Sequence, residues 1–270
     1  MIDYGRFRSI LAERQEHVLI LTLNRPDRMN AVGDDMHEGL EAILADLSHD
    51  TSVRAVVLQA AGRAFCVGGD VKMFDEGEMQ QEQTPHELIE LVTRSSMNLI
   101  ERFIDVPQPI ICAVQGYAMG LGATLALMGD VLLIAEDAQI ADTHVPMGLV
   151  AGDGGALAWP LNLPMGAAKY YLLTGDRLKG AEAARLGLAF KALPADELQA
   201  EALKMAHKFA KLPPLAVQGT KRTLNKIIRH RSQLTLETGL QAEAATFLSN
   251  DHKEAVSAFM EKREATYQGR

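Results

Sequence analysis

The sequence predicts an α/β fold in which the strands are buried and largely parallel. Short runs of consecutive apolar residues, typical of strands covered on both faces, alternate with segments in which apolar residues recur at helical spacing. Their order is strand, helix, strand, loop, helix, strand, helix, strand, which favours helices that connect parallel strands. From about Leu198 onward the β-rich runs stop and charged helical segments take over.

The first three elements follow from apolar patterning and turn signals. A strand is expected at Val18–Leu23, and it ends at the turn signal Asn-Arg-Pro-Asp of residues 24–27. The next apolar residues recur at helical spacing, which predicts an amphipathic helix over about 36–47. A second buried strand is expected at residues 53–58.

The following elements repeat this alternation. A helix is expected over about 85–104, because apolar residues line one side of it and two prolines follow its end. The strand Ile110–Val114 comes next, then a helix over 122–128 and the strand Val131–Ala135.

The change of character near Leu198 divides the chain into a core at residues 1–197 and a helical region at residues 198–270. The 270 residues suit one large domain or a core with a small extension. No low-complexity linker separates the two parts, so we expect the helical region to pack against the core or against a partner subunit.

Composition and charge argue against several classes of protein. No window approaches the twenty apolar residues of a membrane span, and the N-terminal segment lacks the apolar core of a signal peptide. The net charge of −8 argues against a nucleic-acid binder, although a few local cations can still hold a small anionic ligand. Cys66 and Cys112 show neither a disulfide framework nor metal-ligand spacing, so we expect no metal and a reducing, cytoplasmic location.

Two glycine-rich loops expose bare backbone after strands. The stretch "VQGYAMGLGAT" at residues 114–124 leads into a helix, where unpaired N–H groups and the helix dipole favour negative charge. Its spacing misses the phosphate-loop and dinucleotide-binding patterns, and by itself it is compatible with close helix–strand packing. The loop at residues 62–72 also follows a strand and favours a site that stabilises negative charge. Two such loops can each supply one N–H to a single carbonyl oxygen on which charge develops.

Four segments resemble the motifs of one enzyme family. They are "LTLNRPDRMNAV", "FCVGGDVKMF", "VQGYAMGLGATLALMGDVLLIA" and "LLTGDRLKGAEAARLGLAFKAL", and they occur in the family's order over most of residues 10–230. The sequence thereby resembles the crotonase superfamily, also called the enoyl-CoA hydratase/isomerase family. The resemblance implies a crotonase fold, in which repeated β-β-α units form a spiral of two packed sheets and C-terminal helices complete the ligand pocket and form trimers.

The resemblance also implies a substrate class. Family members bind acyl-CoA thioesters, so coenzyme A would be part of the substrate, with no separate cofactor. We expect a homotrimer or a hexamer built as a dimer of trimers, and neither a nucleic acid nor a membrane as partner. The N–H groups of Gly69 and Leu121 occupy the family's oxyanion positions. Ligand contacts are implied at Arg28, Met29, Ala31, Ala64, Val67, Asp70, Val71, Lys72, Tyr117, Met119, Thr124 and Lys221. Arg25, Arg28 and Lys221 are candidate phosphate partners, and each is equally compatible with a solvated surface charge.

Both glutamates with which the family's hydratases add water are absent. Thr124 occupies the first position, and His144, in "ADTHVPMGLVAGDGG", occupies the second. A threonine hydroxyl has no pKa useful for proton transfer, whereas an imidazole titrates near neutral pH. His144 is therefore a candidate acid or base, and its alternative is the structural role common for lone histidines.

Two aspartates extend this candidate site. Asp153 lies among glycines, one position from where some relatives, such as dienoyl-CoA isomerases and a dehalogenase, carry a working aspartate. Alternatively, Asp153 caps the helix that follows. Asp142 can orient His144, but residues two apart on a strand share a face only roughly.

These residues support three hypotheses. The first is an acyl-CoA enzyme that stabilises a thioester enolate, with His144 or Asp153 as the base and with isomerisation, hydration, dehydration or hydrolysis as the outcome. The standard two-glutamate hydration is not expected. The second is an acyl-CoA binder with little turnover. The third is a hydrolase that cleaves a C–C bond of a β-diketone with His144 and Asp153, as a few relatives do.

Overall fold

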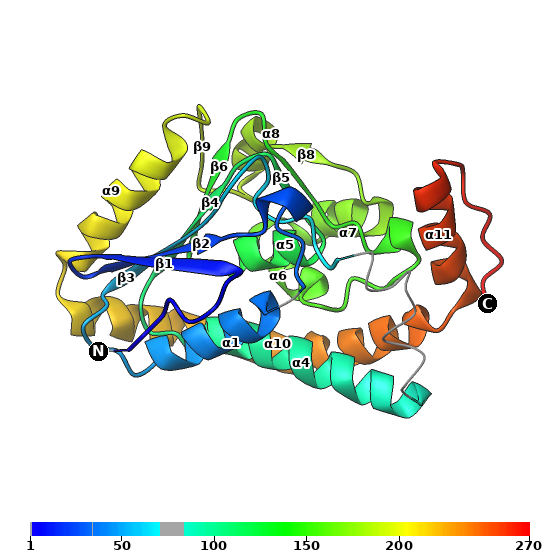
Figure 1. The fold of residues 1–270 in the computed structure, drawn as a ribbon, viewed down its shortest axis with the longest axis horizontal. Coiled ribbons are helices and arrows are strands. Elements are labelled where there is room, and N and C mark those ends of the chain that lie inside the picture. The colour runs from blue at the N-terminus through cyan, green and yellow to red at the C-terminus, as the bar shows by residue number, and fades with distance from the viewer. Residues whose placement is uncertain (1, 34, 71–83) are drawn as a thin grey trace.

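The computed structural model describes residues 2–33, 35–70 and 84–270, and it confirms the predicted α/β class (Figure 1). The strands are β1 (Ile10–Gln15), β2 (Val18–Leu23), β3 (Ala55–Ala60), β4 (Ile110–Val114), β5 (Tyr117–Met119), β6 (Val131–Ala135), β7 (Gln139–Ala141), β8 (Leu178–Lys179) and β9 (Lys191–Leu193). The helices are α1 (Met36–Leu47), α4 (Pro85–Asp105), α5 (Leu121–Leu127), α6 (Gly155–Asn162), α7 (Met165–Thr174), α8 (Gly180–Leu186), α9 (Leu198–Ala210), α10 (Pro214–Phe247) and α11 (Asn250–Glu261), with 3-10 turns η1 (Pro26–Arg28) and η2 (Val145–Met147).

The larger sheet contains the strands that the sequence predicted. Its order is β1-β2-β3-β4-β6-β9, and every neighbouring pair except β1 with β2 is parallel. The predicted bounds of β2, β4 and β6 are confirmed. The strand expected at 53–58 is β3, which begins two residues later because its ladder with β2 starts where Ala55 pairs with Val18. Val53 is buried in the core but precedes this ladder.

A second, smaller sheet has the order β5-β7-β8. Its presence confirms the two-sheet arrangement implied by the resemblance, although none of its strands was predicted. Each of these strands has only two or three residues, too few for a period-two pattern to be visible. An isolated bridge between Cys66 and Ala118 attaches the first glycine loop to this sheet, and this bridge positions the loop beside the second one.

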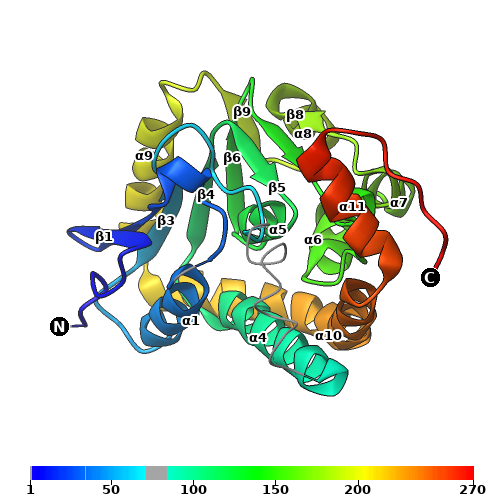
Figure 2. The ribbon, with the colours of Figure 1, turned by 45° about the vertical axis from the view of Figure 1, so that its right-hand side comes forward.

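The helical region beyond residue 197 packs on the core as expected. α9 lies against β3 and β4 of the larger sheet, whereas α10 runs alongside α4. Figures 1 and 2 both show α4 and α10 side by side below the sheets, with α11 near the C-terminus on the side of α7. The division into two domains at residue 197 stays a prediction.

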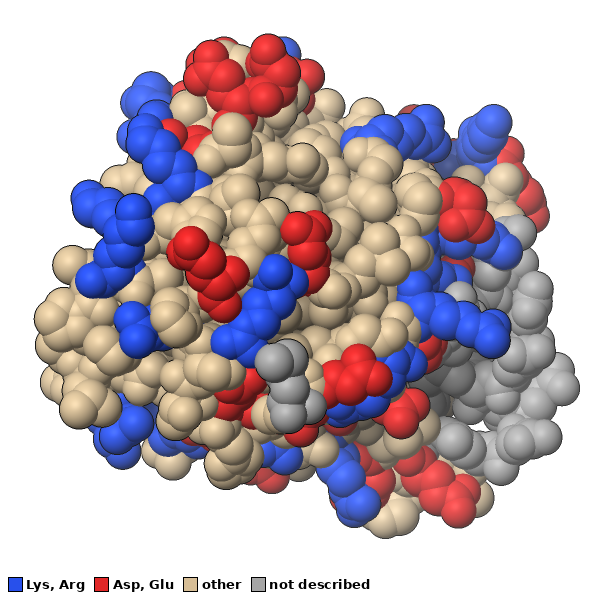
Figure 3. All heavy atoms as spheres, turned by 60° about the vertical axis from the view of Figure 1, so that its left-hand side comes forward, with Lys and Arg blue, Asp and Glu red and all other residues tan. Residues whose placement is uncertain are grey.

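The surface shown in Figure 3 carries charges of both signs. Lys and Arg side chains are interspersed with Asp and Glu, so the described residues form no continuous basic surface on this face. In the described part of the chain, every helix is too short or too polar to cross a membrane. Cys66 and Cys112 are free and buried, in agreement with the expectation that they form no disulfide.

Candidate active site

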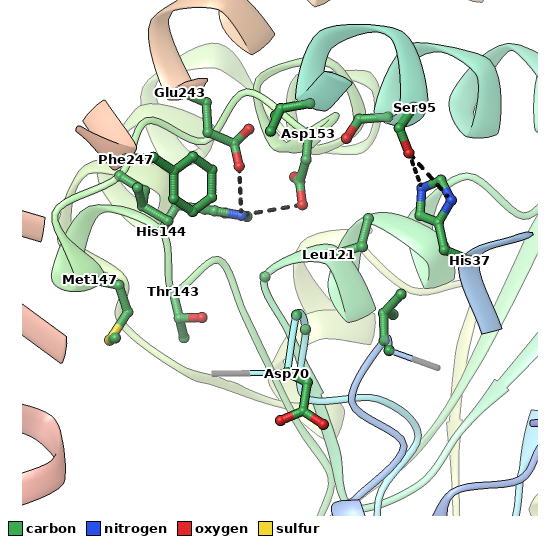
Figure 4. Close-up of a pocket in the computed structure, with 18 of the residues that line it drawn as sticks. His37, Asp70, Ser95, Leu121, Thr143, His144, Met147, Asp153, Glu243 and Phe247 are labelled. Carbon is green, nitrogen blue, oxygen red and sulfur yellow. Dashed lines mark hydrogen bonds and ion pairs between the residues drawn. The ribbon is translucent and has the colours of Figure 1, made fainter. Parts of the chain in front are cut away.

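A pocket of about 360 Å³, within the usual range for small-molecule sites, lies where the glycine loops meet the C-terminal helices. Its walls combine residues of α1 and α4, both glycine loops, the segment after β7, and α10 with α11. The four positions predicted to be catalytic, Gly69, Leu121, His144 and Asp153, all line it. The structure therefore brings these residues together from three separate loops (Figure 4).

Close backbone packing explains why the second loop is rich in glycine. A Cβ atom on Gly122 would lie 2.2 Å from the carbonyl oxygen of Cys66, so only glycine allows α5 to approach the first loop. Gly120 precedes α5 with a φ of +52°, a conformation that favours glycine. This geometry places Leu121, the first residue of α5, beside Gly68.

Among the described residues, the backbone N–H groups of Gly69 and Leu121 take no part in the hydrogen bonds that connect the neighbouring segments. The N–H of Val32 donates to the Gly68 carbonyl and the N–H of Asp70 donates to the Val32 carbonyl, so the intervening Gly69 N–H faces the opposite side of the chain. Leu121 is at the first position of a helix, where an N–H has no intrahelical acceptor. Both residues line the pocket.

His144 is held between carboxylates. Its Nδ1 lies 2.7 Å from Oδ1 of Asp142, and its Nε2 lies 3.2 Å from Oδ2 of Asp153 and 3.8 Å from Oε1 of Glu243 (Figure 4). The contact with Asp142 arises because β7 ends at Ala141 and His144 already has helical backbone angles. The turn thus brings together two side chains that a continuous strand would hold apart, and the orienting role considered for Asp142 has the required geometry.

These contacts decide the charge of His144. Burial by itself lowers the pKa of the imidazole, but Asp153 and Asp142 outweigh this effect and raise the pKa well above its usual value of 6.5. At neutral pH the side chain is therefore an imidazolium that can donate a proton. The role of His144 as an acid or a base stays a prediction.

Asp153 faces the site instead of capping a helix. The N-cap of α6 is Gly154, and no side chain caps that helix. The Oδ1 atom of Asp153 accepts a hydrogen bond from the Thr124 hydroxyl at 3.3 Å, while Oδ2 faces His144. The cap alternative is therefore wrong, and Thr124, fully buried below the pocket, contributes by holding this carboxylate.

Glu243 on α10 is a site residue that the sequence reasoning missed. It is only 4% exposed, and burial together with the nearby charge of Asp153 raises its pKa to about 8. A signal was present in the sequence: Leu236, Leu240, Glu243 and Phe247 follow helical spacing on one buried face. A glutamate on such an apolar face marks a functional candidate.

The same cluster has the composition of a metal site. Donor atoms of His144, Asp153 and Glu243 lie within 4.8 Å of one another. The expectation that the protein binds no metal stays a prediction.

Two of the positions predicted to contact the ligand are part of this pocket. Val67 and Asp70 line it directly. The segment at 25–31 is tied to the first glycine loop, because Arg25 pairs with Asp70 at 3.2 Å and the Asn30 side chain donates to the Ala64 carbonyl. This segment carries the predicted Arg28, Met29 and Ala31, and Tyr117 and Met119 belong to β5, which bonds to the same loop at Cys66. Val71 and Lys72 lie outside the described residues.

Lys221 is not brought to this pocket. Its ammonium group is 8% exposed, lies 2.6 Å from Oδ2 of Asp130 and donates to the Gln108 carbonyl at 2.8 Å. The residue lines a separate cavity of about 650 Å³ between α10 and the core. The ammonium group thus pairs with groups of the chain itself and lies away from the candidate active site, and the role of Lys221 as a phosphate partner stays a prediction.

The fold, with its two sheets, its glycine loops and its C-terminal helices around one pocket, is that of the crotonase superfamily. Residues 13–270 match the sequence model of a family described as enoyl-CoA hydratase/isomerase. The chain belongs to this family.

Similar proteins cover nearly the whole chain. An enoyl-CoA hydratase/isomerase from Mycobacterium paratuberculosis is 38% identical, with a TM-score of 0.86 over 92% of this chain and 97% of that one. A carnitinyl-CoA dehydratase from Mycobacterium avium is 32% identical, with a TM-score of 0.83 over 97% and 99% of the two chains. The 1,2-epoxyphenylacetyl-CoA isomerase of Escherichia coli is 32% identical over 97% of this chain and 98% of its own.

Proposed function

We propose that this protein is an acyl-CoA-processing enzyme that stabilises a thioester enolate with the N–H groups of Gly69 and Leu121. The observation that supports this proposal is that Gly69, Leu121 and the His144 cluster line one pocket. Hydrogen bonds to the thioester oxygen stabilise the charge that develops there and thereby acidify the α-carbon. Coenzyme A arrives as part of the substrate, with no separate cofactor or metal.

The acid and base are assigned from charge and position. The Asp153 carboxylate accepts the proton from the α-carbon, and the imidazolium of His144 donates a proton to the carbon or oxygen that receives it. Asp142 orients the ring through Nδ1. Glu243 remains protonated up to about pH 8 and supplies a second proton beside Nε2.

The carboxylate of Asp153 and the imidazolium of His144 favour a reaction that moves a proton from one carbon of the acyl chain to another. Thr124 and His144 replace the two glutamates of the family's hydratases, so hydration by that mechanism is not proposed. Isomerisation of a double bond requires only removal and return of a proton, and it fits one carboxylate and one imidazolium on the same wall. Hydration or dehydration, and hydrolysis, would need a water in addition.

A second candidate is a hydrolase that cleaves the C–C bond of a β-diketone. The raised pKa of Glu243 favours it, because a carboxylic acid and an imidazolium on one wall can bind and activate a water near a diketone carbonyl. An acyl-CoA binder with little turnover is the remaining alternative.

One panel of assays separates these candidates. The purified enzyme is incubated with 3-enoyl-, 2-enoyl- and 3-hydroxyacyl-CoA and with cyclic 1,3-diketones, each followed by enoyl absorbance and by mass detection of products. We expect turnover of CoA thioesters that is unaffected by EDTA. Turnover of diketones alone would favour the hydrolase, and tight acyl-CoA binding without any product would favour the binder.

We also propose a homotrimer or a dimer of trimers. Exposed apolar side chains along α10, namely Leu215, Leu224, Ile227 and Leu234, support an interface between subunits. Light scattering coupled to size-exclusion chromatography measures the mass, and a monomer at micromolar concentration would contradict the proposal.

The proposed location is the cytoplasm. Two free, buried thiols are compatible with a reducing compartment, where disulfides are rare. Cell fractionation with an antibody to the protein tests this, and recovery outside the cytoplasmic fraction would contradict it.

A further inference from the structure

A second polar group lies in the pocket, away from the proposed reaction centre. His37 of α1 and Ser95 of α4 both line the pocket, and the Ser95 hydroxyl lies 3.3 Å from Nε2 of His37. Figure 4 shows this pair on the opposite side of Leu121 from His144. The pair therefore lies away from the His144 cluster.

The hydrogen-bonding capacity of the pair follows from its surroundings. Burial lowers the pKa of His37, so the ring is neutral at neutral pH. The Ser95 hydroxyl lies 3.3 Å from Nε2 and 3.5 Å from Nδ1 of His37, so it can donate to the ring or accept from it, according to which ring nitrogen carries the proton. In either case the Ser95 hydroxyl keeps a donor or an acceptor position for a group in the pocket.

The walls around this pair are mostly apolar. Neighbouring lining residues include Val32, Leu91, Val92 and Leu121. A plain hydrocarbon chain would remove water from His37 and Ser95 without replacing its hydrogen bonds, which costs roughly 1–3 kcal/mol for each unsatisfied polar group. An acyl group that carries a hydrogen-bonding oxygen avoids this penalty.

Charge excludes a carboxylate as that oxygen. Glu41 lies next to His37, and Asp70 and Asp153 line the same pocket. These carboxylates would repel a carboxylate on the acyl chain. A hydroxyl group is neutral and can both donate and accept a hydrogen bond.

We propose that His37 and Ser95 form a specificity subsite for a hydroxyl group on the acyl chain, remote from the thioester. This inference rests on the proposed acyl-CoA function and names the class of substrate: hydroxylated acyl thioesters rather than plain hydrocarbon chains.

Binding measurements test the subsite independently of turnover. Calorimetry gives the Kd of straight-chain acyl-CoAs of six to ten carbons and of isomers with a single hydroxyl or keto group at each position from C5 outward. We expect the enzyme to bind one hydroxylated isomer at least about tenfold more tightly than the plain chain, which corresponds to about 1.4 kcal/mol. In Ser95→Ala and His37→Phe this preference falls below about threefold, while the affinity for the plain chain is retained.

Control variants at the C-terminal end of α1 separate the subsite from general effects. Ser48 is the C-cap of α1 and His49 follows it, and both lie outside the pocket, so Ser48→Ala and His49→Leu keep the preference. Equal binding of plain and hydroxylated chains by the wild type would overturn the subsite and leave the acyl-CoA function intact. Preference for a keto isomer, or a hydroxyl preference that survives both variants, would overturn it as well. Failure to bind any acyl-CoA would overturn the proposed function itself.

Discussion

The Nε2 atom of His144 lies 3.2 Å from Oδ2 of Asp153, and the ring's other nitrogen lies 2.7 Å from Asp142. One buried imidazole is thus flanked by two aspartates, with Glu243 on a C-terminal helix as a third neighbour. Because the two aspartates stabilise a positively charged ring, the protonated imidazole of His144 and the carboxylate of Asp153 are in contact at the wall of the pocket. This relationship leads to the first three predictions below.

Removing either partner of the contact should abolish proton transfer. In His144→Gln and Asp153→Asn we expect kcat to fall by roughly a hundredfold or more, since general acid–base catalysis contributes about 10²–10⁴-fold. The Kd of a non-reacting acyl-CoA should change by less than about threefold. His230→Gln, an exposed histidine on α10, serves as the control. Near-normal kcat in both variants would remove these residues from the mechanism.

Loss of the Asp142 carboxylate should shift the pH profile. Asp142 raises the pKa of His144, so Asp142→Asn lowers it and reduces the imidazolium fraction at neutral pH. Activity that needs the imidazolium falls as pH rises through this pKa, and the high-pH limb of kcat/KM should move to lower pH. The exposed Asp137→Asn is the matched control. A limb at unchanged pH, or one displaced upward, would show that Asp142 does not act through the ring.

Glu243 should make stability depend on pH. Its pKa in the folded protein is about 8 against an ordinary 4.5, so the folded state binds a proton that the unfolded state releases. The stability from this group is fully present below about pH 4.5 and is lost as pH rises through about 8. Glu243→Gln should therefore reduce the fall in unfolding free energy between pH 5.5 and 8.5.

Urea unfolding at these two pH values measures the effect. Glu237→Gln, exposed on the same helix, should keep the wild-type slope. His144, whose pKa is also raised, loses stability in the same direction, so a residual slope remains in the Glu243 variant. An unchanged slope in Glu243→Gln would contradict the raised pKa.

Leu121 provides a test of the backbone donor. It occupies the first position of α5, where helices tolerate proline, so Leu121→Pro removes the N–H without breaking the helix. We expect Leu121→Pro to lose roughly a hundredfold or more in kcat, and Leu121→Ala to stay within about tenfold of the wild type. Circular dichroism checks that both variants are folded. Equal losses in the two variants would refute a role for the amide.

The sequence by itself determined the fold class, the central strands and the family. The runs at Val18–Leu23 and Ile110–Val114 are predictable because strands buried on both faces must be apolar throughout. The glycine loops were recognisable because close backbone approach leaves no room for a Cβ, as at Gly122. His144 and Asp153 were predicted because the resemblance places them at or beside positions where the family carries catalytic carboxylates, and the structure places both on the wall of one pocket.

Only the tertiary structure showed which charged side chains are in contact. Glu243 lies ninety residues beyond Asp153, and Lys221 proved to be bound to Asp130 rather than directed toward the pocket. The His37–Ser95 pair likewise depends on the packing of α1 against α4. Apolar periodicity is a local property of the chain, whereas the pKa and the role of a polar side chain depend on neighbours that folding brings from distant segments.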